Sequence, residues 1–305
     1  MTLELSDHWV WDNWVAHNGD DQHLFFLRAS RALIDPDRRH HRAAIGHAVS
    51  QNLRTWTLLP DALVHSDGPA FDDLATWTGS VIQAPDGTWR LFYTGISRAE
   101  RGLTQRIGWA TSPDLIEWTR MTSPALEADP RWYETLGEGT WPDEAWRDPF
   151  VFEHEGLFHM FITARSNLGD PDGRGVVGHA TSPDLDTWTV LEPLTNPAGF
   201  GQMEVVQARI VNGTPSLLFS CGAADASVSA AFGDRATATW VARGETLLGP
   251  WDMAGARPVQ LPSLYAAQFV RDREEWALMG FTNEVDGVFV GSIIDPIPWS
   301  DDLLG

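Results

Sequence analysis

A short phrase that recurs along the chain constrains the fold more than any other feature. The phrase is an apolar segment with Gly and Ala at fixed places, a Ser-Pro-Asp-Leu turn, and a Trp-Thr pair that opens the next strand. Full copies begin at Ile107 and Val177, a copy without Pro-Asp begins at Ile45, and a weaker copy begins at Trp240. Ser and Asp favour turns because their side chains bond to the local backbone. Recurrence every 60 to 70 residues or so predicts an array of similar units.

Two further strands precede each phrase and complete a four-stranded unit. The first is predicted at residues 9–16, 79–84, 150–153, 205–211 and 266–271. The second, rich in aromatic residues, is predicted at residues 23–28, 89–95, 157–163, 216–220 and 275–281. Turn signals at residues 85–87 and 212–213 join the two strands as hairpins.

Five such units predict an all-β protein, a five-bladed β-propeller with four antiparallel strands per blade and a central pocket. We expect residues 1–305 to form one catalytic domain, with the strand at residues 288–293 completing the last blade and closing the ring. A long β-sandwich is the alternative, but five copies of one strand order fit radial repetition better.

Composition and charge exclude several classes of function. Asp and Glu number 42 against 21 for Lys and Arg, so the net charge of −21 would repel nucleic acids and anionic membranes. The chain contains no lysine, which excludes Schiff-base chemistry, and a single cysteine, Cys221, which excludes an internal disulfide. The histidines show no metal-ligand spacing. We therefore expect a neutral polar substrate, no cofactor, no metal, and no nucleic-acid or membrane partner.

The ends of the chain and its apolar runs bear on location. The N-terminal residues show no basic region followed by an apolar run, and no apolar run approaches the length of a membrane span. We therefore expect a cytoplasmic protein.

Three carboxylates stand at or near inner strands, where a propeller converges on its centre. They are Asp12 among tryptophans, Asp148 between Arg147 and a proline, and Glu204 among apolar residues. Because proline disfavours the helical region for the residue before it, Asp148 is expected to be extended. Burial of an unpaired carboxylate is costly, so such placement indicates a paired or functional group. The alternative for each is a structural salt bridge or a turn cap.

Paired carboxylates in a tryptophan-lined pocket are typical of glycosyl transfer, where one acid protonates the leaving oxygen and a second carboxylate attacks. Glu204 suits the acid, since its apolar neighbours would raise its pKa. Asp12 suits the nucleophile, held by the amide of Asn13, and Asp148 would bind sugar hydroxyls. Tyr265 and Gln268 open the fifth blade and are further candidates to reach the pocket. The basic run at residues 38–42 is interpreted as a solvated loop or a subunit contact.

Four motifs in order resemble those of the fructan-active clan of glycoside hydrolases, families 68 and 32, which share a five-bladed propeller. Residues 11–14, Trp-Asp-Asn-Trp, are similar to the Trp-Asp-Ser-Trp nucleophile motif of family 68. Residues 77–80, Trp-Thr-Gly-Ser, resemble its Trp-Ser-Gly-Ser element, and residues 147–149 match its Arg-Asp-Pro motif. Glu204 stands where the clan has its acid/base residue. The chain looks closest to a short family 68-like β-fructofuranosidase.

The resemblance implies a glycosidase that releases fructose from sucrose or short β-fructosides by a retaining mechanism, with some fructosyl transfer. Asp12 would be the nucleophile, Asp148 the transition-state stabiliser and Glu204 the acid/base. The residues implied or expected to contact the sugar are Trp11, Asn13, Trp77, Ser80, Arg147 and Gln202.

Three departures from the family patterns narrow this expectation. The acid/base Glu is usually followed by Arg in family 68 and by Cys in family 32, whereas Val205 follows here, and Gln202 replaces an acidic residue of family 68. The chain is also shorter than family 68 enzymes and lacks the β-sandwich domain of family 32. A reduced acceptor side favours hydrolysis over polymer synthesis. The alternatives are a family 43-like propeller acting on arabinosides or xylosides, which is commonly inverting, and a non-catalytic sugar-binding propeller.

Overall fold

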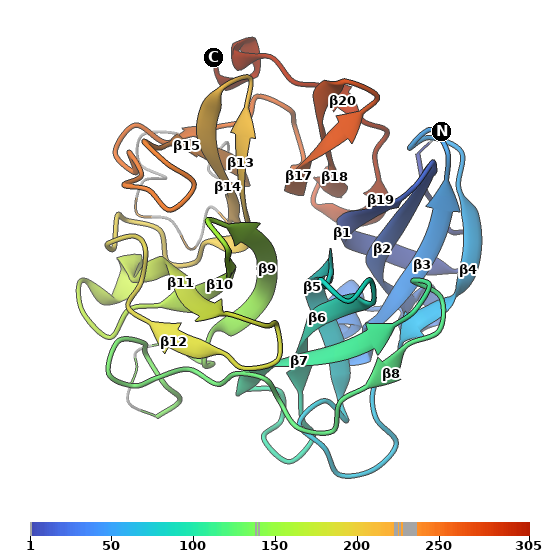
Figure 1. Cartoon of the computed structure of the whole chain (residues 1–305), viewed down its shortest axis with the longest axis horizontal. Helices are drawn as coiled ribbons and strands as arrows, with labels where there is room; N and C mark the ends of the chain where they lie inside the picture. The colour runs from blue at the N-terminus through green and yellow to red at the C-terminus, as the bar shows by residue number, and fades with distance from the viewer. Residues whose placement is uncertain (1, 138, 140, 223–224, 226, 228–236) are drawn as a thin grey trace.

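The computed structural model of the chain describes residues 2–305 except 138, 140, 223–224, 226 and 228–236. Five four-stranded antiparallel sheets stand around a central axis, as Figure 1 shows, so the predicted five-bladed β-propeller is confirmed. Among the described residues, no helix has the length and apolar character needed to cross a membrane.

Each blade is an up-and-down sheet taken from consecutive sequence. The first blade consists of β1 (His8–Asn18), β2 (Asp21–Ser30), β3 (Ala44–Ser50) and β4 (Thr57–Leu63). The second consists of β5 (Ala75–Gln83), β6 (Trp89–Ile96), β7 (Gln105–Ser112) and β8 (Thr119–Arg120). The third consists of β9 (Trp146–His154), β10 (Leu157–Arg165), β11 (Gly175–Ser182) and β12 (Thr189–Leu191).

The fourth blade keeps this pattern, and the fifth departs slightly from it. The fourth consists of β13 (Glu204–Val211), β14 (Thr214–Cys221), β15 (Ala238–Arg243) and β16 (Arg257–Pro258). The fifth consists of β17 (Leu264–Asp272), β18 (Glu275–Val285), β19 (Val288–Ile293) and β20 (Ile297–Pro298), the last two both pairing with β18. Short 3-10 helices lie between and after strands: η1 (Arg31–Leu33), η2 (Pro36–Arg42), η3 (Pro171–Gly173) and η6 (Asp301–Leu304).

The ring closes through the N-terminal segment. The backbone of Leu3 exchanges both hydrogen bonds with Ile293 of β19, at 2.9 and 3.0 Å. The N-terminal residues therefore extend the fifth blade before the chain enters the first. The predicted strand at residues 288–293 does lie in the last blade. The antiparallel bridge between Leu3 and Ile293 connects this strand to the N-terminal segment.

The recurring phrase owes its form to a locked turn between the third and fourth strands of a blade. In the third blade, Oδ1 of Asp184 accepts from the backbone N–H groups of Asp186 and Thr187 at 2.9 and 2.7 Å. Leu185 is fully buried with φ of 69°, and its carbonyl accepts from the indole N–H of Trp188 at 2.9 Å. The second blade repeats this arrangement with Asp114, Leu115 and Trp118. The repeated Trp thus has two roles. Its ring packs in the blade, and its indole N–H holds the backbone of a buried residue with positive φ.

Candidate active site

A one-residue β-bulge interrupts every inner strand, which places five irregularities around one pocket. The register shifts fall between Trp11 and Asn13, Trp77 and Gly79, Arg147 and Phe150, Glu204 and Gln207, and Tyr265 and Gln268. A bulge redirects side chains and is common beside active sites. Asp12 and Asp148 occupy two of these bulges with positive φ values of 37° and 57°. Such backbone is uncommon for non-glycine residues and marks these positions as built features.

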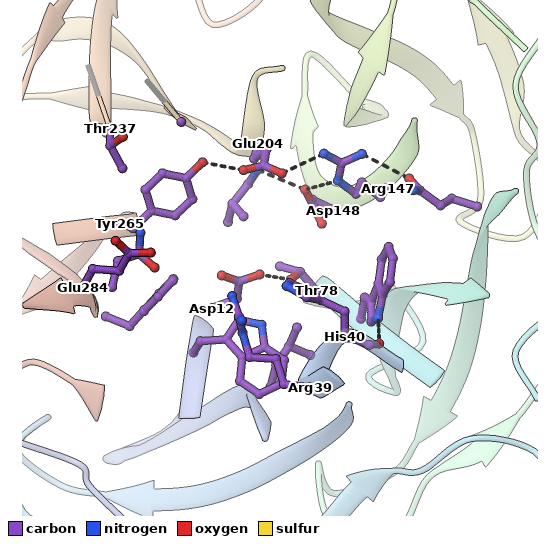
Figure 2. Close-up of a pocket in the computed structure, with 18 of the residues that line it drawn as sticks. Asp12, Arg39, His40, Thr78, Arg147, Asp148, Glu204, Thr237, Tyr265 and Glu284 are labelled. Atoms are coloured by element: carbon purple, nitrogen blue, oxygen red, sulfur yellow. Dashed lines mark hydrogen bonds and ion pairs between the residues drawn. The ribbon is translucent and has the colours of Figure 1, made fainter. Parts of the chain in front are cut away.

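The bulges surround a central pocket of about 570 Å³, shown in Figure 2. The structure places Asp12, Asp148 and Glu204 together on its wall, although they come from the first, third and fourth blades. Its walls also include the following side chains: Trp11, Arg39, His40, Trp77, Thr78, Gln105, Asp143, Arg147, Tyr265 and Glu284.

Asp12 lies at the bulge of β1 and accepts a short hydrogen bond from the hydroxyl of Thr78. Burial, together with the negative charges of Asp148 and Glu204, raises the pKa of Asp12 to about 7. The Thr78 hydrogen bond opposes this rise because it favours the ionised form. Asp12 is therefore a carboxylate that gains or loses its proton close to neutral pH.

Asp148 is buried and held by three hydrogen bonds, two that its carboxylate accepts and one that its backbone donates. Its Oδ2 accepts from the Thr163 hydroxyl at 2.9 Å and from the backbone N–H of Val205 at 3.2 Å. Its own N–H donates to the Thr94 hydroxyl oxygen at 2.9 Å. Burial raises its pKa to about 6, opposed chiefly by the positive charge of Arg147. The expectation of an extended Asp148 before proline is wrong, because two residues of β9 bulge opposite one of β10 and Asp148 takes φ of 57°.

Glu204 receives a donor on each carboxylate oxygen. Nη2 of Arg147 donates to Oε1 at 2.7 Å, and the Tyr265 hydroxyl donates to Oε2 at 2.5 Å (Figure 2). Burial and the charge of Glu204 raise the pKa of Tyr265 well above its usual value, so the phenol stays a donor. Sequence reasoning assigned Glu204 an apolar setting from its chain neighbours, but its side chain points away from them into this polar contact.

Arg147 is itself positioned by two glutamines. Its Nη1 donates to Oε1 of Gln105 at 3.2 Å, and its Nη2 donates to Oε1 of Gln202 at 3.1 Å. Gln105 in turn donates to Asp143 at 2.7 Å. Gln202 is buried behind Arg147 and does not line the pocket. In this structure the predicted sugar contact of Gln202 is thus a contact that orients the guanidinium.

Two further predicted sugar contacts, Asn13 and Ser80, do not line the pocket either, because the bulges in β1 and β5 change which side chains face it. Asn13 is fully buried and does not reach Asp12; Thr78 supplies the predicted hydrogen bond instead. Ser80 accepts from the backbone N–H of Val151 at 3.0 Å and lines a different, smaller cavity. Trp11 and Trp77 do line the pocket as expected, and the Trp77 indole N–H donates to the His40 carbonyl at 2.6 Å.

The sequence interpretation missed part of the pocket wall. Arg39 and His40, assigned to a solvated loop, lie on η2 and enter the pocket beside Trp11. Glu284 of β18 also lines it, and the signal of these three residues in the sequence is weak because they stand outside the inner strands. Asp143 lines the pocket from the loop at residues 129–143, which is long for a blade connection and for that reason is a candidate pocket rim. Tyr265 reaches the pocket as one of two candidates, whereas Gln268 does not. Among the described residues, no group of three or more His, Cys, Asp or Glu side chains is arranged to hold a metal ion.

The fold and the site together define the class of protein. It is a five-bladed β-propeller whose central pocket carries three carboxylates from separate blades. The chain belongs to the glycosyl hydrolases family 32, whose N-terminal domain matches residues 14–288.

Known proteins agree with this assignment. A sucrose-6-phosphate hydrolase of Bacillus subtilis is 31% identical over 195 residues, 63% of this chain and 35% of that protein. An insoluble β-fructofuranosidase isoenzyme of Arabidopsis thaliana is 27% identical over 188 residues, 60% of this chain and 31% of that protein. The matches thus span about a third of the length of these relatives.

Solved structures share the fold. An inulosucrase from Halalkalicoccus jeotgali, bound to kestose, superposes with a TM-score of 0.76 at 23% identity, covering 92% of this chain and 78% of that one. A family 32 β-fructofuranosidase of Bombyx mori gives a TM-score of 0.75 at 20% identity, covering 96% of this chain and 61% of that one.

Proposed function

We propose that the protein hydrolyses sucrose or short β-fructosides and releases fructose by a retaining double displacement. The observation that carries this proposal is the convergence of Asp12, Asp148 and Glu204 on one pocket. Membership of family 32 and relatives named as a β-fructofuranosidase and a sucrose-6-phosphate hydrolase support it. The family match also favours fructosides over the arabinosides or xylosides of the alternative reading.

In the first step, ionised Asp12 attacks the anomeric carbon of the fructosyl unit while Glu204, carrying a proton, gives it to the leaving glycosidic oxygen. The bond to the leaving group breaks as the fructosyl–Asp12 ester forms. In the second step, Glu204 takes a proton from water, the water oxygen attacks the same carbon, and Asp12 leaves as a carboxylate. Two inversions at one carbon give net retention.

Asp148 and Arg147 stabilise this chemistry without exchanging protons. Asp148 is pinned by Thr163 and the Val205 N–H, so its carboxylate is pre-positioned to accept hydrogen bonds from fructosyl hydroxyls. Arg147 keeps a positive charge beside Glu204, which holds that side chain at the leaving oxygen. Trp11 and Trp77 offer flat apolar faces to the sugar.

The charge of the pocket selects a neutral substrate. Its wall carries five carboxylates, Asp12, Asp143, Asp148, Glu204 and Glu284, against the guanidinium groups of Arg39 and Arg147. A phosphoryl group on the substrate would meet this negative excess at close range. We therefore infer a preference for sucrose over phosphorylated sucrose.

Val205 follows the acid/base residue and presents an apolar side chain at the pocket. It offers no hydrogen bond to an incoming sugar hydroxyl, which favours water as the acceptor and leaves fructosyl transfer as a minor reaction.

The test is a panel of sucrose, sucrose-6-phosphate, kestose, inulin, levan and nitrophenyl pentosides, with the anomer of the first product followed by NMR. We expect β-configured fructose from sucrose and kestose, with free fructose exceeding fructan at high sucrose concentration. An inverted first product, or turnover of pentosides alone, would contradict the proposal.

A further inference from the structure

A second cavity, of about 230 Å³, lies at the opposite end of the central channel. The five inner strands that carry the active-site bulges continue into its wall, contributing Trp14, Ser80, Phe150, Arg209 and Gln268. Along β13, Arg209 lies five residues beyond Glu204, which at about 3.3 Å per residue separates the two levels by roughly 15 Å. The cavity is thus a separate chamber that shares its strands with the active site.

Arg209 is a cation without a partner in this chamber. In the described part of the chain, its guanidinium makes no ion pair or hydrogen bond, and its one specific contact is the Phe150 ring, 4.7 Å from the guanidinium carbon. Burial lowers its pKa to about 10, so the group still carries its charge at neutral pH. Arg209 is half-buried, and a cation without a described ion pair is unexpected in a chain of net charge −21, where Arg147 and Arg165 meet carboxylates.

Several other polar groups line the chamber. A second cation, Arg271, donates to the Glu274 carbonyl at 2.9 Å, and His17 and Gln207 also line the wall. The carbonyl of Gln268 accepts from Gln207 at 3.3 Å, which leaves the amide NH₂ of Gln268 without an acceptor among the described residues. Ser80 accepts from the Val151 N–H, so its hydroxyl proton is likewise free to donate. The indole N–H of Trp14 is buried without a described partner. No described Asp or Glu lines the cavity.

A cation with two uncommitted donors, Gln268 and Ser80, and no carboxylate among the described lining residues is the complement of an anion. Each water occupies about 30 Å³, so the space holds one oxyanion with a few waters. We propose that this chamber binds a small oxyanion such as phosphate or sulfate, with Arg209 as its main ligand and Gln268 and Ser80 as supporting donors. The anion ties β5, β13 and β17 together, so its binding stabilises the fold, not the chemistry.

The test is thermal unfolding of the whole protein in 10 mM sodium phosphate or sodium sulfate against sodium chloride at equal ionic strength. We expect both oxyanions to raise the wild-type Tm by roughly 2–4 °C. Arg209→Gln should abolish this rise. Arg257→Gln, at an exposed position of β16 in the same blade, should keep it. The rate of fructose release should change in neither variant.

Gln268→Glu covers the case in which Arg209→Gln does not fold. Its carboxylate keeps the acceptor used by Gln207 and supplies an internal partner to Arg209, so the variant should be as stable as wild type and unresponsive to oxyanions. A wild-type Tm that does not rise above the chloride value overturns the proposal. An oxyanion response of Gln268→Glu equal to that of wild type overturns it too.

Discussion

Nη2 of Arg147 donates to Oε1 of Glu204 at 2.7 Å, across the boundary between the third and fourth blades. The fifth blade completes the contact through the Tyr265 hydroxyl, which donates to the second oxygen of the same carboxylate at 2.5 Å. A carboxylate that accepts two fixed donors has little freedom to rotate. The proposed acid/base residue is therefore positioned by three blades, and its geometry depends on the closure of the ring.

Replacing Tyr265 by Phe should test this positioning. The variant removes one hydrogen bond to the Glu204 side chain while keeping the ring that packs against Phe281, with ring centroids 5.9 Å apart. We expect kcat to fall about 10- to 100-fold, because the loss of one bond to a charged group is worth about 1.5–3 kcal/mol.

Phe281→Leu is the matched control, because it disturbs the packing of Tyr265 without removing its hydroxyl. It should lower kcat by no more than about threefold, since the bond to Glu204 is kept. An equal fall in kcat in the two variants would show that Tyr265 only packs and does not act through Glu204.

Substitution of the nucleophile separates catalysis from stability. Asp12→Asn should reduce kcat by at least about 10³-fold, as expected for loss of a group that forms the covalent intermediate. The same change removes one of three like charges in a buried cluster, so the free energy of unfolding should not fall. Kinetics on sucrose and urea unfolding measure the two effects. Retained activity with a lowered free energy of unfolding would show that Asp12 is structural.

The propeller could be predicted from sequence because its blades repeat, but the pocket could be predicted only in part. Side chains alternate between faces along a strand, so one inserted residue moves every later side chain to the other face. The bulge in β5 therefore turns Thr78 toward Asp12 and leaves Ser80 in the wall of the second cavity. The bulge in β1 likewise buries Asn13.

The part of the pocket wall that η2 forms could not be predicted from the sequence, for a different reason. Arg39 belongs to a run of charged residues that is usually solvated, and nothing local indicates that it packs over the Phe289 ring, 3.8 Å from its guanidinium carbon. Such contacts depend on how the first and fifth blades meet. Asp148 could be predicted as a site residue because it lies at an inner strand and carries a charge that would be costly to bury alone.

The fall in rate on the acid side of the pH–rate profile, its acid limb, should reflect the protonation of Asp12. Burial and like charges place its pKa at about 7, so protons occupy it increasingly below that pH and remove the nucleophile. We expect kcat/KM for sucrose to fall as pH drops through 7 towards 6. Thr78→Val removes the bond that favours the ionised form and should move this limb upward by roughly one pH unit.

Thr76→Val provides the control for that shift. Thr76 is buried two residues earlier in β5 and does not line the pocket, so the same change of side chain there should leave the limb in place. A limb that moves equally in both variants would assign the effect to strand packing and not to Asp12.

Stacked histidine pairs should make the fold sensitive to acid. In the first blade, Nδ1 of His23 and Nε2 of His47 are 2.9 Å apart, and burial lowers the pKa of His47 to about 3. The third blade repeats this pair as His159 and His179, where burial lowers the pKa of His179 to about 4. The unfolded chain takes up protons below its ordinary pKa of about 6.5 while the folded chain resists them. Stability is thus full above pH 6.5 and is lost as pH falls towards 4.

We expect the free energy of unfolding of the wild type to fall between pH 7 and pH 5 by roughly 1–2 kcal/mol for each of these two histidines. His47→Gln with His179→Gln should lower stability at pH 7, because ring stacking on Phe25, with centroids 4.4 Å apart, is lost. The double variant should nevertheless lose less stability on acidification, since glutamine does not titrate. Urea unfolding at pH 7, 6 and 5 measures both effects, with exposed His41→Gln as the control. An unchanged pH slope in the double variant would show that other groups control the acid sensitivity.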